Sequence, residues 1–263
     1  TRRKIFTNCA RRYAIKYIDN NRPYLGQNKV AYQSPWDLMI KTSRDVFFQL
    51  LADLHRGVNW SEKLIQSRVR FELTSQLVSF ALTGDRISNK QKNQLIASAF
   101  IRIKKILKKS IIARMVDNDI KEWSFHNRIK PVSFGHIEVY CSPDIVYRYK
   151  SKWHLVRINF QSEKIQPYVE LELCSMLLWS KYNQYLPNID EKFALHGLFY
   201  NDRKWRNYSI IPSQKMFQES KQLLEKDVHN MNLLQIEFMK NMNPNKLPLA
   251  NSKNYCIRCP YKI

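Results

Sequence analysis

Acidic residues and glycine are scarce in this sequence of 263 residues, which contains 22 Asp and Glu and only 5 Gly. The acids are outnumbered by 44 Lys and Arg, so the formal net charge is +22. A charge of this size favours a polyanionic partner, and nucleic acid is the most common one. We therefore expect nucleic acid, DNA rather than RNA, as the partner. The alternative is a solvated basic surface that binds nothing.

Long apolar runs and phosphate-binding motifs are also missing. No run of about 18 apolar residues occurs, so no membrane span is predicted. The sequence has no glycine-rich phosphate loop and no Walker motif, so ATPase activity is not predicted. The 5 cysteines are odd in number and scattered, which argues against a secreted disulfide framework. We expect an intracellular protein, cytoplasmic or nucleoid-associated.

What is present suffices for a folded core, because 44% of the residues are hydrophobic and 13% are aromatic. Three helices are predicted before residue 117. Ser34 caps the first, Pro35 is its first residue, and Gly57 follows its end. The second is expected over residues 61–84. The third is expected over residues 88–116, where apolar residues recur every three or four positions.

Hydrophobic periodicity changes from helical to alternating at about residue 130. The alternation predicts three strands, at 136–142, 144–150 and 153–160. Further patterns predict a helix at 167–186, a hairpin of two strands at 195–201 and 205–211, and a long helix at 213–241. The sequence therefore predicts a mixed α/β fold in which a core sheet is flanked by helices. We expect one domain over 1–263, with a helical region at 34–117, an α/β core at 130–241 and a tail at 242–263. The helical region is predicted to cap the core.

Candidate site residues follow from the strand at 153–161. Its even positions are mostly apolar and are predicted to face the core, whereas Arg157, Asn159 and Gln161 are predicted to share the opposite face. Asp144, at the start of the preceding strand, is expected to reach the same cleft. Glu138 lies one strand earlier still.

These segments resemble the PD-(D/E)XK nucleases, and within them the RecB-like branch that includes CRISPR-associated exonucleases. The motifs that carry the resemblance span nearly the whole chain: "FTNCARRYAIKYI", "SRDVFFQLL", "SPDIV", "RINFQ", "ELELCSMLL" and "YCIRCPY". The resemblance implies a restriction-endonuclease-like core with Asp144 as the acid that binds Mg²⁺ or Mn²⁺.

This sequence departs from the family pattern at its catalytic positions. Asn159 and Gln161 stand where an acid and a lysine are expected. Phe47 replaces a His, Glu170 a Gln and Cys174 a Tyr. An amide is a poor ligand for a hard cation, and Gln161 cannot carry positive charge. We therefore expect a degenerate, non-cleaving site at which a metal would bind weakly.

Relocation of the catalytic groups is the alternative to loss. An acid and a lysine for a rebuilt site could come from five residues near the degenerate positions: Glu138, Glu163, Lys164, Glu170 and Glu172. Ordinary surface charge is the other interpretation of these residues.

The cysteine pattern also resembles iron–sulfur members of the family. Cys9 lies near one end of the sequence, Cys256 and Cys259 form C-x-x-C near the other, and a fourth ligand is expected beyond Ile263. The resemblance implies a cluster of the 4Fe–4S type, with zinc or free thiols as alternatives. Cys141 and Cys174 are predicted to lie in the core.

Basic residues predict where nucleic acid would bind. We expect three on one helix face (Arg102, Lys105, Lys109) and four along the central strands (Arg148, Lys150, Lys152, Arg157). Neighbouring aromatic residues either stack on bases or pack in the protein. None of the histidines has the spacing of metal ligands, and none is assigned a role.

The expected function is nucleic-acid binding without cleavage, as a DNA-binding module or as a subunit of a larger nuclease or helicase complex. Two alternatives remain open at this point. One is an active Mg²⁺- or Mn²⁺-dependent deoxyribonuclease with relocated catalytic groups. The other is a structural subunit of an assembly that contains RNA or other proteins.

Overall fold

A computed structural model describes most of the chain: residues 2–19, 34–81, 87–126, 131–134, 137–161, 169–189, 192–250 and 256. The chain divides into two compact units. The larger contains residues 33–220, and the smaller contains residues 1–32 together with 221–263. The prediction of one domain over 1–263 stays a prediction.

The helices of the larger unit begin and end largely where the sequence signals indicate. They are α3 (Pro35–His55), α4 (Glu62–Ala81), α5 (Asn89–Leu107), α6 (Ser110–Val116) and α7 (Val169–Lys181), and α8 (Gln214–Asn241) begins in this unit. Ser34 and Asp37 form a reciprocal capping box at the start of α3, and Ser88 and Gln91 form another at the start of α5. Such caps satisfy backbone N–H groups that would otherwise lack partners, and each contributes about 1 kcal/mol.

The third predicted helix is two helices. Alpha-helical structure stops at Leu107 and resumes at Ser110, with Lys109 as the N-cap of α6. Lys105 and Lys109 therefore do not lie on one continuous helix face. The apolar spacing runs through the break because both helices bury residues in the same core, Ile103 and Ile106 from α5 and Ile112 from α6.

A five-stranded sheet forms the centre of the larger unit, in the order β1-β4-β5-β6-β7. Its strands are β1 (Trp123–Phe125), β4 (Ile145–Tyr149), β5 (Lys152–Asn159), β6 (Phe193–Asn201) and β7 (Lys204–Ile210). Only the β5–β6 pair is parallel, with α7 between them in sequence. Two-residue turns join β4 to β5 and β6 to β7, each with both residues at positive φ.

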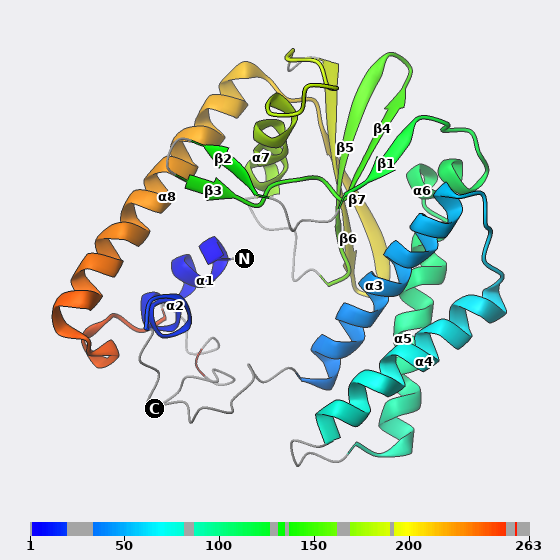
Figure 1. Ribbon diagram of the computed structural model, residues 1–263, viewed down its shortest axis with the longest axis horizontal. Coiled ribbons are helices and arrows are strands. Elements are labelled where there is room, and N and C mark those ends of the chain that lie inside the picture. The colour runs from blue at the N-terminus through cyan, green and yellow to red at the C-terminus, as the bar shows by residue number, and fades with distance from the viewer. Residues whose placement is uncertain are drawn as a thin grey trace. The chain divides into compact units, whose positions relative to one another are not determined.

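Helices cover both faces of this sheet (Figure 1): α3 to α6 lie on one face and α7 lies on the other. One core cluster includes Phe47, Ile103 and Ile112 from the helices and Val156 and Leu198 from the sheet. The helical region therefore shares its hydrophobic core with the sheet. On β5, Val156, Ile158 and Phe160 are buried, as the alternation predicts.

The smaller unit contains α1 (Arg2–Asn8), α2 (Ala10–Tyr17), the rest of α8 and a short 3-10 helix, η2 (Pro244–Lys246). Tyr13, Ala14 and Ile18 pack with Leu234 and Phe238 of α8 in a separate core cluster. The Arg11 guanidinium donates to the backbone oxygens of Asn245 at 2.7 Å and Leu247 at 3.0 Å. These contacts join the two parts of the unit that are far apart in sequence.

Candidate functional site

Asp144 immediately precedes β4, and its side chain is fully buried, with 0% exposure. Its Oδ2 accepts a hydrogen bond from the Ile158 backbone N–H at 2.7 Å. Its Oδ1 lies 4.0 Å from Nη2 of Arg44, on α3. The Asp144 backbone donates to the Val156 carbonyl at 2.8 Å and accepts from the His126 N–H at 2.9 Å. The carboxylate is thus held inside the protein by a backbone donor and a guanidinium.

Asn159 and Gln161 lie at the end of β5, and both are exposed. The Gln161 backbone N–H donates to Asn159 Oδ1 at 3.1 Å. The indole Nε1 of Trp36 donates to Gln161 Oε1 at 2.8 Å. Both side-chain oxygens therefore accept hydrogen bonds within the protein, and the NH₂ groups are the remaining polar groups of these amides.

This donor set does not fit Mg²⁺ or Mn²⁺, which prefer several oxygen ligands and usually carboxylates. Asp144 is a single carboxylate whose Oδ2 already accepts from the Ile158 N–H and whose Oδ1 lies 4.0 Å from Arg44, and its neighbours at the end of β5 supply neutral amides. Within the described parts of the chain, no three His, Cys, Asp or Glu side chains are grouped so that they could hold a metal ion.

Glu138 and Glu170, the other acids among the candidate site residues, lie on elements outside the β4–β5 hairpin. Glu138 is on β3 (Ile137–Val139), which pairs with β2 (Val132–Phe134) in a separate two-stranded sheet. In the main sheet the neighbours of β4 are β1 and β5. Glu138 therefore lies one strand before β4 in sequence, as predicted, but β3 and β4 belong to different sheets.

Glu170 lies on the exposed surface of α7. It accepts a short hydrogen bond from the Tyr208 hydroxyl of β7, and this bond raises the pKa of Tyr208. Glu172 is also exposed on α7, whereas Cys174 is buried. Glu163 and Lys164 lie outside the described residues, so relocation to those two positions stays a hypothesis.

Arg102 is buried, with 6% exposure, although the sequence predicts it on a basic outer face. Its guanidinium lies over two rings, 4.9 Å from the centroid of Trp36 and 4.5 Å from that of Tyr200. It also donates to the Phe160 carbonyl at 3.3 Å and to the Ser98 carbonyl at 3.0 Å. Burial lowers the pKa of this guanidinium from its ordinary value.

Arg157 is the second buried cation among the predicted contacts, with 4% exposure. Its Nη2 donates to the Cys141 carbonyl at 3.2 Å, on the face of the sheet opposite the α3 to α6 core. The odd positions of β5 therefore do not form one polar surface. Arg157 and Leu155 are buried, whereas Asn159 and Gln161 are open to solvent.

The remaining predicted cations lie at two opposite ends of the sheet. Lys105 is exposed, and its ammonium donates to the Arg203 carbonyl, in the β6–β7 turn, at 2.8 Å. That turn lies at the Asn159 end, because β5 and β6 are parallel and Asn159 pairs with Phe199. Arg148 and Lys150 are exposed at the β4–β5 hairpin, at the other end.

Two further predicted cations are half-buried, namely Lys109 at the start of α6 and Lys152 on β5. An exposed ion pair of 3.8 Å joins Arg148 to Glu122. Lys150 lies over the Tyr149 ring at 5.5 Å. Contacts of this kind at an exposed surface are weak, so these cations remain accessible to a polyanion.

A polar chain across the sheet was not predicted. His154 Nδ1 is 2.8 Å from His196 Nε2, and His196 Nδ1 is 2.7 Å from Ser209 Oγ. His154 Nε2 lies 3.3 Å from the Tyr149 carbonyl, which can only accept a hydrogen bond, so His154 Nε2 is the donor. In neutral imidazoles the Ser209 hydroxyl then donates to His196 Nδ1, and His196 Nε2 donates to His154 Nδ1. Burial lowers the pKa of His154, and burial followed by the charge of His154 lowers that of His196 to about 4. Tyr147 stacks on His154 at 4.4 Å.

The described residues do not test the predicted cysteine cluster. Cys9 caps α2, where its sulfur accepts from the Arg12 N–H at 3.4 Å. Cys256 is half-buried, and Cys259 lies outside the described residues. A shared cluster or zinc ion stays a prediction. Cys141 and Cys174 are buried as expected, and burial raises the pKa of Cys141 to about 11.

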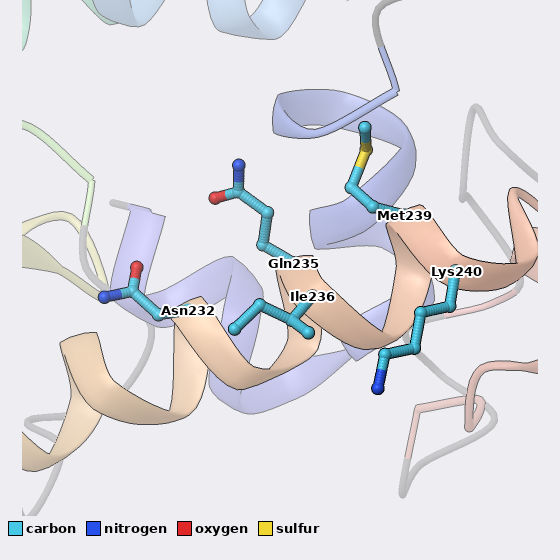
Figure 2. A pocket seen from close by; sticks show the side chains of 5 residues that line it. All are labelled: Asn232, Gln235, Ile236, Met239 and Lys240. Carbon is cyan, nitrogen blue, oxygen red and sulfur yellow. The ribbon is translucent and has the colours of Figure 1, made fainter.

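Two of the hollows on the described surface are considered as candidate sites. One, of about 310 Å³, is lined by Arg44 and His126 close to Asp144, together with Asp45, Phe48, Gln49, Ala52 and Phe125. Burial raises the pKa of Asp45. The other, of about 610 Å³, lies along one side of α8 in the smaller unit, with Ile236 and Met239 beside Asn232, Gln235 and Lys240 (Figure 2). This second hollow lacks a group of titratable side chains on which chemistry could be built.

No protein-family model matches the chain, and no curated protein matches it. None of the helices in the described parts of the chain is long and apolar enough to cross a membrane.

Proposed function

We propose that this protein binds nucleic acid, in particular DNA, through its basic surface and does not cleave it at Asp144. The observation that carries the proposal is the fully buried Asp144 carboxylate, which accepts a hydrogen bond from the Ile158 N–H and lies 4.0 Å from the Arg44 guanidinium. We further propose that the fold is of the PD-(D/E)XK nuclease type with a degenerate site, acting as a binding module or as a subunit of a nucleic-acid-processing complex.

The arrangement around Asp144 supports loss of cleavage on electrostatic grounds. A divalent cation would have to displace the Arg44 guanidinium and the Ile158 N–H, and it would gain only one carboxylate. No positive group stands at Gln161 to orient water or to stabilise developing charge. Arg44 supplies the positive charge that balances Asp144. The acid thereby acts as a structural group that joins β4, β5 and α3.

The position of Phe47 supports the same proposal. The resemblance expects a histidine there, but Phe47 is fully buried and packs edge-to-face against Phe160 at 5.6 Å. A polar ring at this place would lose its hydration within an apolar core. The position at which the resemblance expects a catalytic histidine is thus part of the hydrophobic core.

The order of elements supports the nuclease-like fold. Asp144 precedes a hairpin of two strands, a helix follows, and the next strand pairs in parallel with the second. This order places the start of β4 beside the end of β5, which is where the resemblance expects its acidic positions. The mixed sheet with helices on both faces is the observed basis for this part of the proposal.

Binding through the basic surface follows from the charge. A net charge of +22 creates a potential that attracts polyanions, and each phosphate contact releases a counterion. We expect little sequence preference, because phosphate contacts carry no base information. Lys105, Arg148 and Lys150 are exposed cations available for such contacts.

The proposal is tested by equilibrium binding of the full chain to a labelled DNA duplex and to a single strand, without divalent metal, at several salt concentrations. Affinity should fall by about 1000-fold or more between 50 and 200 mM salt if six or more phosphates are contacted. A dissociation constant that is independent of salt would contradict the proposal. RNA of matched length distinguishes the nucleic acids, and equal affinity for it would remove the preference for DNA.

A further inference from the structure

Trp36 is a large aromatic side chain that remains 42% exposed at the start of α3. The Arg102 guanidinium lies over its ring at 4.9 Å. Guanidinium groups favour the faces of aromatic rings, and the attraction is stronger where the cation is desolvated, as Arg102 is. The indole is therefore supported by a buried cation while a large part of its surface stays in solvent.

The support beneath Trp36 is rigid. Arg102 is fixed by hydrogen bonds to the Phe160 and Ser98 carbonyls and by contact with the Tyr200 ring. The carbonyl of Arg102 itself accepts from the Trp205 indole at 2.9 Å. Gln161 Oε1 accepts from the Trp36 indole N–H at 2.8 Å, which fixes the rotation of the ring within its plane. An aromatic side chain held in this way loses little entropy when a ligand stacks on it.

The surroundings of Trp36 suit a nucleobase better than an apolar partner. Gln161 is exposed and its NH₂ group is a hydrogen-bond donor, as is the NH₂ group of Asn159 two residues earlier. Lys105, one helical turn from Arg102 on α5, is exposed at the same end of the sheet. The combination of a stacking ring, amide donors and a cation for the neighbouring phosphate is the chemistry used to bind unpaired nucleotides.

We propose that Trp36 is a stacking site for an unpaired nucleobase, with Arg102 as its support and Gln161 as its positioning residue. This inference rests on the proposed nucleic-acid binding and specifies its substrate class, a single-stranded segment or a duplex with an unpaired end. The amides that replace the expected acid and lysine would then act as donors to the bound nucleotide.

The test compares two probes of equal charge, an oligothymidine of about ten nucleotides and an abasic oligonucleotide of the same length. Both keep every phosphate, so their difference measures contact with the bases. The full chain should bind oligothymidine about 5- to 150-fold more tightly than the abasic probe. Trp36→Ala should remove most of that difference and leave the affinity for the abasic probe unchanged. Trp36→Phe should retain part of it.

The matched control is Tyr185→Ala, because Tyr185 is 81% exposed and belongs to the same unit. It should bind both probes as the parent protein does. Unfolding curves of each variant establish that it is folded. Equal affinity of the parent protein for both probes would overturn this inference while leaving nucleic-acid binding intact. Failure to bind either probe would overturn this inference, and the proposed function would fail as well only if the labelled duplex also did not bind.

Discussion

Two neighbouring regions at the end of β5 differ in the exposure of their polar groups. Around Asp144 the charged side chain is sealed inside, and its partners are a backbone N–H and a guanidinium. Around Trp36 and Gln161 the polar and aromatic groups are exposed, and only their support, Arg102, is buried. A charged residue in a sequence motif therefore indicates a binding site only if its polar atoms are accessible to a ligand. The open region is therefore the better candidate for contact with a ligand.

The largest effect should come from removing the sealed carboxylate. Asp144→Ala leaves the Ile158 N–H without its acceptor inside the protein and should lower the free energy of unfolding by about 3 kcal/mol. Asp144→Asn keeps an acceptor oxygen and should lose less than half as much. Urea unfolding measures both. A loss under 0.5 kcal/mol for Asp144→Ala would mean that the carboxylate is not a structural group.

The second largest effect on stability should come from replacing Arg102, the buried support of Trp36. Arg102→Met keeps much of the side-chain volume but removes two hydrogen bonds and the contacts with the Trp36 and Tyr200 rings, so it should cost about 2 to 3 kcal/mol. Lys105→Met, an exposed change on the same helix, should cost under 1 kcal/mol. Thermal and urea unfolding of the two variants check the difference. If Arg102→Met were as mild as Lys105→Met, the support of Trp36 would have to be reconsidered.

Acid should weaken the protein through His196, whose pKa is lowered to about 4 in the folded state. The unfolded chain, with a pKa near 6.5, binds the proton more readily, so stability falls as pH decreases below 6.5 until about pH 4. The expected loss from this group is about 2 kcal/mol at pH 5.

The pH effect has a matched control in His229, which is exposed on α8. His196→Asn should flatten the dependence of unfolding free energy on pH between 6.5 and 5, and His229→Asn should leave it unchanged. An unchanged slope in His196→Asn would show that the His154–His196 contact does not govern acid stability.

The smallest effect concerns single exposed cations. Lys105→Ala or Arg148→Ala should each reduce the slope of log affinity against log salt by about 0.9 for duplex DNA, if that side chain contacts one phosphate. Stability should change by less than about 0.5 kcal/mol. Titrations at four salt concentrations provide the slopes. A slope that stays the same in both variants would place the contact surface elsewhere on the protein.

Local sequence signals predict most of the fold, because caps and periodicity are local properties. Ser34 with Pro35 and Ser88 mark helix starts, and the alternation in residues 153–160 marks β5. The break between α5 and α6 was missed because both helices bury residues in one core. The three-residue strands β1 and β2 were missed because so few residues show no clear alternation.

The site was harder to predict, because burial is decided by packing between distant segments. Arg102 resembles a surface cation in sequence, yet Trp36 and Tyr200, 66 residues before it and 98 after it, contact its guanidinium. His154 and His196 meet only because β5 and β6 are parallel neighbours. A histidine at an inward position of each strand is the sequence signal that could have indicated their contact.

The central claim is that Asp144 serves the fold and does not support cleavage. The most direct measurement incubates supercoiled plasmid with the parent protein and with Asp144→Asn, each in Mg²⁺ and in Mn²⁺, after both are shown to be folded. We expect no nicking or linearisation by the parent protein above the level seen with Asp144→Asn. Cleavage by the parent protein that disappears in folded Asp144→Asn would contradict it.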